Sequence, residues 1–270
     1  MSDSIAVRLR RETRRITERG RDEAAFHLWS ATGRGRQNRR NVANLSGRYR
    51  GRRCIIMGNG PSLLKCDLNR FASEVTIVSN AHFLIWDTLL YRPTFLTVED
   101  TLVAEDRAEE LASISTVTKL FPFDLRHLLP DAEAHTLYVN FPRRYRGFPS
   151  FSHDLTKRAY WGGTVSFLNI QLATYLGCDP IVLVGFDHRY HVPPERVTGA
   201  VIESVGPDVN HIHPDYFGPG YRWHDPNLAR MEAAYRCARR ELERIGVRIY
   251  NATDGGELEV FDRLSLDSLI

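Results

Sequence analysis

Short apolar stretches recur along residues 54–250 and are separated by longer amphipathic or polar segments. Several stretches carry apolar side chains at consecutive positions, which is typical of strands buried on both faces in a parallel sheet covered by helices. The intervening segments can cross over as helices. The pattern predicts an α/β fold, a Rossmann-like, mostly parallel sheet with helices on both faces. The predicted strands span residues 54–57, 75–79, 94–98, 116–121, 136–139, 181–185 and 247–250.

Two helices have recognisable ends. In residues 164–176 the apolar side chains fall on one face, Thr164 can cap the first turn, and Gly177 can close the last. In the second helix Asp225 is the expected N-cap and the proline after it the first helical residue. Its apolar residues repeat at spacings of three and four until Gly246.

The chain divides into two unequal parts. Residues 1–44 are predicted to form a basic arm, with a helix over 4–30 and a connector over 32–40, ahead of one domain over 45–270. Within that domain, residues 187–225 have little periodicity but many aromatic residues, prolines and histidines. A long irregular segment of this kind is typical of a functional lid, and its aromatics argue against disorder.

Composition excludes several classes of protein. The chain has no apolar run of about 18 residues, and its first residues lack the apolar core of a signal peptide, so we expect a cytoplasmic protein. Cys54, Cys66, Cys178 and Cys237 have no Cys-x-x-Cys spacing, which disfavours a disulfide framework and a zinc knuckle.

Positive charge is concentrated at the start of the chain. The net charge is +3, yet fifteen arginines and only five carboxylates precede Cys54. One interpretation is an anchor on an anionic membrane surface, which would place the protein at the inner membrane face. The other is a solvated helix that packs on a partner subunit. Nucleic acid is not an expected partner, because no base-recognition pattern is present.

Polar residues follow several predicted strands at their carboxyl ends. Because ligands of open α/β sheets bind outside these ends, their convergence predicts an active crevice. The residues concerned are Gly58, Asn59, Gly60, Ser62, Asn80, Glu99, Asp100, Asp187 and Asn251.

The turn over residues 58–62 matches neither the dinucleotide fingerprint nor the P-loop. Gly58 and Gly60 are expected to clear room for a ligand, Asn59 to offer an amide, and Ser62 to begin a helix whose N-terminus favours anions. The alternative is a simple strand-to-helix turn.

A second glycine turn opens the helix that begins at Thr164. Gly162 and Gly163 precede it directly, so the two turns together can hold two ends of a phosphorylated donor.

His224 is the candidate general base. It lies at the end of the lid, just before the helix capped by Asp225, and a neutral histidine there can accept a proton from a hydroxyl. Asp225 is close enough in sequence to influence it. The alternatives are a capping or packing role. His211 and His213 with nearby Asp187 form only a loose metal-binding pattern, because no helical His-x-x-x-His or cysteine accompanies them.

These segments, in their order along residues 45–262, resemble the bacterial sialyltransferases of glycosyltransferase family 42. They also resemble a broader group of bacterial proteins related to 6-hydroxymethylpterin diphosphokinase, to which residues 211–226 and 250–256 look most similar. The segments that carry the resemblance are Gly58-Asn-Gly-Pro-Ser-Leu63, Ser79-Asn80, Gly162-Gly-Thr-Val165, Leu183-Val-Gly-Phe-Asp187 and His224.

The sialyltransferase resemblance implies a transferase that moves a sugar from a nucleotide-sugar, CMP-activated donor to a cell-surface glycan or glycolipid acceptor. It implies no metal requirement and a homo-oligomer. By position, Asn59 and Gly60 would contact the donor phosphate, and Asn80, Gly163 and Thr164 the nucleotide. His224 would deprotonate the acceptor, with Asp187 and lid tyrosines (Tyr190, Tyr216 and above all Tyr221) as further catalytic candidates.

Two departures keep an alternative open. Tyr160 stands where the sialyltransferase pattern has an arginine, and Glu99 and Asp100 are paired carboxylates suited to Mg²⁺ on a di- or triphosphate. They favour a Mg²⁺-dependent diphosphokinase that transfers diphosphate from ATP to a hydroxymethyl pterin. A third hypothesis is a binding protein that kept the crevice without the chemistry.

Overall fold

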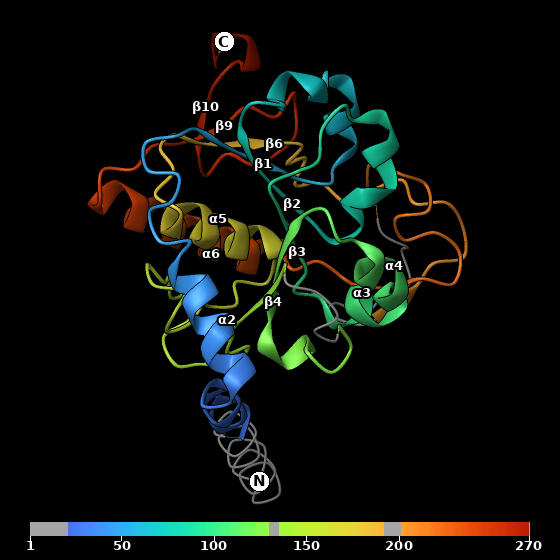
Figure 1. The fold of residues 1–270 in the computed structure, drawn as a ribbon. Helices are drawn as coiled ribbons and strands as arrows, with labels where there is room; N and C mark the ends of the chain where they lie inside the picture. The colour runs from blue at the N-terminus through green and yellow to red at the C-terminus, as the bar shows by residue number, and fades with distance from the viewer. Residues whose placement is uncertain (1–20, 130–134, 192–200, 270) are drawn as a thin grey trace, which may run out of the picture.

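The computed structural model describes residues 21–129, 135–191 and 201–269. Its centre is an eight-stranded sheet of order β10-β9-β6-β1-β2-β3-β4-β5, in which every neighbouring pair is parallel (Figure 1). The strands are β1 (Cys54–Met57), β2 (Val75–Ser79), β3 (Phe95–Thr97), β4 (Thr118–Pro122), β5 (Thr136–Val139), β6 (Ile181–Val184), β9 (Ile249–Asn251) and β10 (Asp262–Arg263). The predicted parallel α/β sheet is confirmed.

The strand order reverses between β1 and β6. The chain steps outward from β1 to β5 and then returns to place β6 on the other side of β1. Ligands of open α/β sheets bind at such a switch point, outside the carboxyl ends of the strands. A separate antiparallel hairpin pairs β7 (Val201–Glu203) with β8 (Arg222–His224) within the lid.

Alternate residues of the strands pack against helices on opposite faces. Cys54 and Ile56 face α2 (Gly33–Ala43), α5 (Val165–Tyr175) and α6 (Leu228–Arg244). Ile55 and Met57 face α3 (Thr101–Asp106), α4 (Ala108–Ser113), short 3₁₀ helices and the lid. The 3₁₀ helices are η1 (Pro61–Lys65), η2 (Leu68–Phe71), η3 (Asn80–Thr88), η4 (Phe123–Leu125) and η5 (Leu266–Leu269).

The predicted helix over 164–176 is α5. The Thr164 hydroxyl accepts from Ser166 N, and Gly177 follows the helix with a φ of 79°. The predicted N-cap of the other helix is wrong. Asp225 is buried before α6 begins, and the cap is Asn227, whose side chain accepts from Arg230 N.

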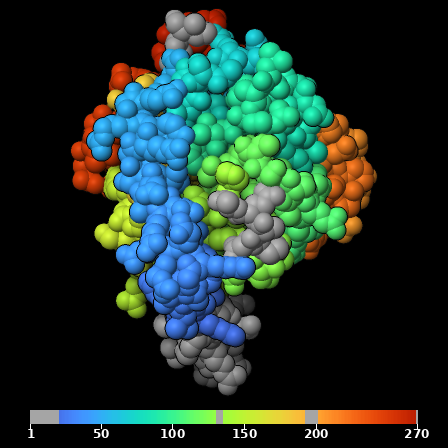
Figure 2. All heavy atoms as spheres, in the orientation of Figure 1, coloured from blue at the N-terminus to red at the C-terminus, as the bar shows by residue number. Residues whose placement is uncertain are grey.

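The predicted connector over 32–40 is wrong as well, because most of it lies in the helix α2. Thr32 caps that helix, and Asn38 exchanges two hydrogen bonds of 2.8 Å with the backbone of Tyr138 in β5. Residues 21–30 are helical, and the predicted helix over 4–20 lies outside the described residues. In Figure 2 the segment coloured blue runs as a band along one face of the molecule.

No helix in the described part of the chain combines the length and apolarity needed to cross a membrane. The four cysteines are free thiols, as predicted.

Candidate active site

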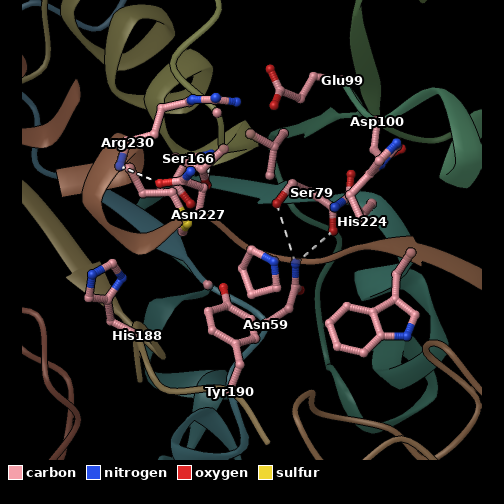
Figure 3. A pocket seen from close by; sticks show the side chains of 18 of the residues that line it. Asn59, Ser79, Glu99, Asp100, Ser166, His188, Tyr190, His224, Asn227 and Arg230 are labelled. Carbon is pink, nitrogen blue, oxygen red and sulfur yellow. Dashed lines mark hydrogen bonds and ion pairs between the residues drawn. The ribbon is translucent and has the colours of Figure 1, made fainter. Parts of the chain in front are cut away.

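A cleft of about 1280 Å³ lies at the carboxyl ends of the strands, around the switch point between β1 and β6 (Figure 3). It brings together residues from strand-end loops that are far apart in the sequence. The predicted site residues that line it are Gly58, Asn59, Gly60, Asn80, Glu99, Asp100, Gly163, Thr164, Asp187 and His224.

Gly58 and Gly60 have a different purpose from the predicted one. A side chain on Gly58 would collide with the carbonyl oxygen of Gly185, and one on Gly60 with the carboxylate of Asp187. The two loops are also joined by a hydrogen bond of 3.0 Å from Gly60 N to Gly185 O. The expectation that these glycines clear room for a ligand is therefore wrong, since the loop after β6 fills that room.

Asp187 holds the loop after β6 against the loop after β1. Its carboxylate accepts from the Ser62 hydroxyl at 2.6 Å and more weakly from Ser62 N, while its own carbonyl accepts from Glu257 N. Ser62 lies behind the cleft wall, at the first turn of η1. We predicted Asp187 to be catalytic, but its carboxylate has a structural partner in Ser62.

Asn59 connects three elements at the floor of the cleft. Its side-chain nitrogen donates to Tyr216 Oη at 2.9 Å and to Ser79 O at 3.2 Å. Its backbone carbonyl accepts from Ile212 N. The lid is thus bound to the ends of β1 and β2.

Asn59 and Asn80 leave two side-chain oxygens buried without a hydrogen-bond partner among the described residues. Asn80 also has a left-handed φ of 54°, which asparagine tolerates better than most residues. Since buried polar atoms are nearly always satisfied, each of the two oxygens is suited to accept a hydrogen bond from water or from a bound ligand.

His224 pairs with Asp100 across the cleft mouth. Its Nδ1 lies 3.2 Å from Asp100 Oδ2, and the hydrogen bond with this carboxylate raises the pKa of His224. Arg222 anchors the same strand through Asp106 and Glu105 of α3. The sequence suggested the adjacent Asp225 as the group acting on His224, but the partner is Asp100.

The two metal candidates are not a preassembled metal site. Asp100 uses one oxygen for His224 and the other for Leu102 N. Burial raises the pKa of Glu99 to about 8, although the charge of Arg143 and a hydrogen bond from Trp161 oppose this shift. Among the described residues, no three His, Cys, Asp or Glu side chains gather in an arrangement that could hold a metal ion.

An arginine-rich wall was missed at the sequence level. Arg143, Arg144 and Arg146 follow β5 and line the cleft together with Trp161 and Arg230. The first three follow a predicted strand end, so the same rule that selected the other loops could have found them.

Arg230 comes from the first turn of α6, and no sequence pattern marked it. Its guanidinium lies 5.3 Å from the centre of the Trp161 ring, and its side chain packs against Gly163, whose φ is 81°. The N-terminus of α5, capped by Thr164, opens onto the same cleft. Together they make this wall electropositive.

Three further predicted residues lie outside the cleft lining. Tyr221 packs under Arg107, 4.1 Å from its guanidinium carbon, where it helps to hold the lid. Asn251 is fully buried and bonds to Leu258 O and Thr253 N, and Gly162 backs onto Phe167. Tyr190 and Tyr216 do line the cleft.

A family model described as 6-hydroxymethylpterin diphosphokinase MptE-like matches residues 32–192. No curated protein matches the sequence. A solved structure of the MAf glycosyltransferase from Magnetospirillum magneticum AMB-1 is similar, with a TM-score of 0.52 and 18% identity over 87% of this chain. The match spans 39% of that longer chain, and at this identity it shows a shared fold.

Proposed function

This chain belongs to the 6-hydroxymethylpterin diphosphokinase MptE-like family, and on that premise we propose that it is a transferase, specifically a glycosyltransferase. The donor is a nucleotide-sugar, CMP-activated by analogy with the sialyltransferases that its motifs resemble, and the acceptor is a hydroxyl of a cell-surface glycan or glycolipid. The similar fold of a solved glycosyltransferase supports this choice over other transfers.

The observation that carries the proposal is the pairing of His224 with Asp100 at a cleft whose other wall is electropositive. With Nδ1 held by Asp100, Nε2 is the atom that accepts the proton of the acceptor hydroxyl, and the carboxylate stabilises the resulting imidazolium. The freed oxygen attacks the anomeric carbon. The departing phosphate is stabilised by Arg230 and the N-terminus of α5.

The proposed reaction needs no metal, because the arginines and the helix N-terminus supply the positive charge that the leaving phosphate requires. Asn59 and Asn80 offer their unpartnered oxygens to donor groups of the nucleoside or the sugar. A carboxylate-bearing donor sugar would add a second anion for the arginine wall.

The test is a transfer assay with purified wild-type protein and its His224→Ala variant, using a panel of nucleotide-sugars. We expect the variant to bind the donor nucleotide normally and to lose transfer by about 100- to 10,000-fold, the usual contribution of a general base. His213→Gln is the matched control, since His213 belongs to the same lid but does not line the cleft. Loss of nucleotide binding in His224→Ala, or undiminished transfer, would contradict the assignment.

A diphosphokinase is the second candidate, favoured by the family description and by Glu99 and Asp100 on the cleft wall. Mg²⁺ bound to nucleotide phosphates needs only one or two protein carboxylates. Because both oxygens of Asp100 already make hydrogen bonds, Asp100 would have to release His224 before it could bind Mg²⁺. This candidate predicts AMP release from ATP with Mg²⁺ and a hydroxymethyl pterin, and loss of that release in Asp100→Asn. Nucleotide binding with neither activity would favour the non-catalytic hypothesis.

A further inference from the structure

Residues 24–66 contain no aspartate or glutamate, while residues 34–53 contain eight arginines. This stretch includes α2 and the segment 47–52, which leads into β1. We call the segment 47–52 the basic strap. Elsewhere the chain carries an acidic excess, because the residues before Cys54 account for more than its whole net charge. The concentration of charge therefore belongs to one structural region.

The backbone explains why the arginines of the basic strap face outward. The N–H groups of Gly47, Tyr49 and Gly51 each donate at 2.9 Å to successive carbonyls at the end of α5, those of Tyr175, Leu176 and Gly177. The alternate residues Arg48, Arg50 and Arg52 then face away from the helix, and all three are exposed. Arginines near the C-terminus of a helix are stabilised by the helix dipole, which explains part of this arrangement.

Helix α2 extends the same charge along the edge of the sheet. It turns Gly35, Asn38 and Val42 toward the core, and Arg34, Arg36, Arg39 and Arg40 are exposed. In Figure 2 this region forms the continuous blue band along one face.

Among the described residues, the arginines of this band differ from those of α6 in their lack of carboxylate partners. Within the described residues, no ion pair joins Arg34, Arg36, Arg39, Arg40, Arg48, Arg50 or Arg52 to an acidic side chain. On α6, by contrast, Arg236, Arg239 and Arg244 each pair with a glutamate. Within the described residues, seven exposed arginines thus keep their charge unpaired by carboxylates, which leaves it available to an external anion.

We propose that the basic strap and the outer face of α2 bind the anionic headgroups of a membrane surface. Tyr49 packs inward against Phe95, so no aromatic side chain of the strap is presented for stacking on nucleic-acid bases. Clustered arginines that face outward are suited to an anionic leaflet.

The position of the strap is compatible with activity at the membrane. It precedes β1 and so lies at the amino end of that strand, whereas the cleft begins at Gly58 after the carboxyl end. Membrane attachment through the strap therefore leaves the cleft open to substrates. This inference does not depend on the proposed function.

The test is sedimentation of the full chain with vesicles of phosphatidylcholine alone or with 30% phosphatidylglycerol, which is about one lipid in three. We expect binding only to the anionic vesicles, lost at about 0.5 M salt because the ions screen the attraction. The triple variant Arg48→Gln, Arg50→Gln, Arg52→Gln should bind about 100-fold more weakly, since each arginine contributes about fivefold.

Arg236→Gln, Arg240→Gln, Arg244→Gln is the matched control, because it removes the same charge from exposed positions of α6. Thermal melts of both variants check that they fold. The proposal would be overturned if both variants bound the vesicles equally weakly, or if the wild type did not bind anionic vesicles. It would also be overturned if the strap variant lost nucleic-acid binding or self-association instead of vesicle binding.

Discussion

At the carboxyl ends of its strands the sheet presents a cleft in which buried oxygens of Asn59 and Asn80 lack partners among the described residues. At the amino end of β1 it presents Arg48, Arg50 and Arg52, which are exposed. Buried polar atoms without partners cost free energy until a ligand satisfies them, whereas exposed arginines cost little and act through their summed charge. The first surface suits a small ligand, and the second suits an extended anionic one.

Arginines are arranged differently in the two regions. Arg230 lies beside an aromatic ring and a helix N-terminus, so a phosphate placed there meets several oriented donors at once. The arginines of the basic strap are spread along an exposed backbone and converge on no single point. Substitutions in the two regions should therefore affect different measurements.

Arg230→Gln tests whether the arginine wall of the cleft binds the donor phosphate. Loss of charge-assisted hydrogen bonds should lower kcat/KM for the nucleotide-sugar by about 10- to 150-fold, the equivalent of about 1.5–3 kcal/mol. The measurement is steady-state transfer at varied donor concentration. Arg236→Gln on the same helix is the control, and an equal loss there would mean that the wall is not a phosphate site.

The pH dependence of transfer tests the base. Because Asp100 raises the pKa of His224, transfer should increase as the pH rises through a value above 6.5, where the imidazole loses its proton. Asp100→Asn should move this acid limb to lower pH and reduce the plateau, since the ring loses its orienting partner. A limb that stays in place in the variant would show that another group titrates.

The same shift has a consequence for stability. A raised folded-state pKa means that the pair stabilises the protein fully below the unfolded pKa of about 6.5 and loses this contribution as the pH rises through the folded value. Half of the His224 side chain is exposed, so this effect should be small beside the change in rate.

Ser62→Ala tests whether Asp187 is a structural group. Removing the hydroxyl that donates to Asp187 should lower the free energy of unfolding by about 1 kcal/mol, measured by denaturant titration, and leave kcat nearly unchanged. A fall in kcat with unchanged stability would return Asp187 to the catalytic group.

Much of the fold could be predicted because its strands are continuous apolar runs that end in polar or glycine-rich loops. The strand-end rule then selected seven residues that line the cleft, including Gly58, Asn80 and Asp187, and His224 was selected by its place at the end of the lid. The pairing of His224 with Asp100 could not be predicted, because it depends on how the lid hairpin docks on α3.

The wrong predictions share a cause, which is that tertiary packing overrode local signals. Asp225 and the proline after it look like a helix start, yet Asp225 is buried and α6 begins only at Leu228, capped by Asn227. The glycines and arginines of 32–40 look like a linker, yet Asn38 fixes a helix there by bonding to β5.

The smallest effect should come from the triple strap variant in the transfer assay. With a soluble acceptor its kcat/KM should stay within about twofold of the wild type, because substitutions far apart with no shared partner act independently. A large loss would show that the two ends of the sheet are coupled.

We propose that the cleft binds a nucleotide-sugar by its own positive charge. A thermal-shift panel of CMP, CDP, UDP, GDP and ATP, each with and without Mg²⁺, tests it most directly, because a ligand of the native state raises Tm by mass action. We expect a cytidine nucleotide to raise Tm without Mg²⁺ and Arg230→Gln to abolish the increase. A shift with ATP alone, and only when Mg²⁺ is present, would contradict it.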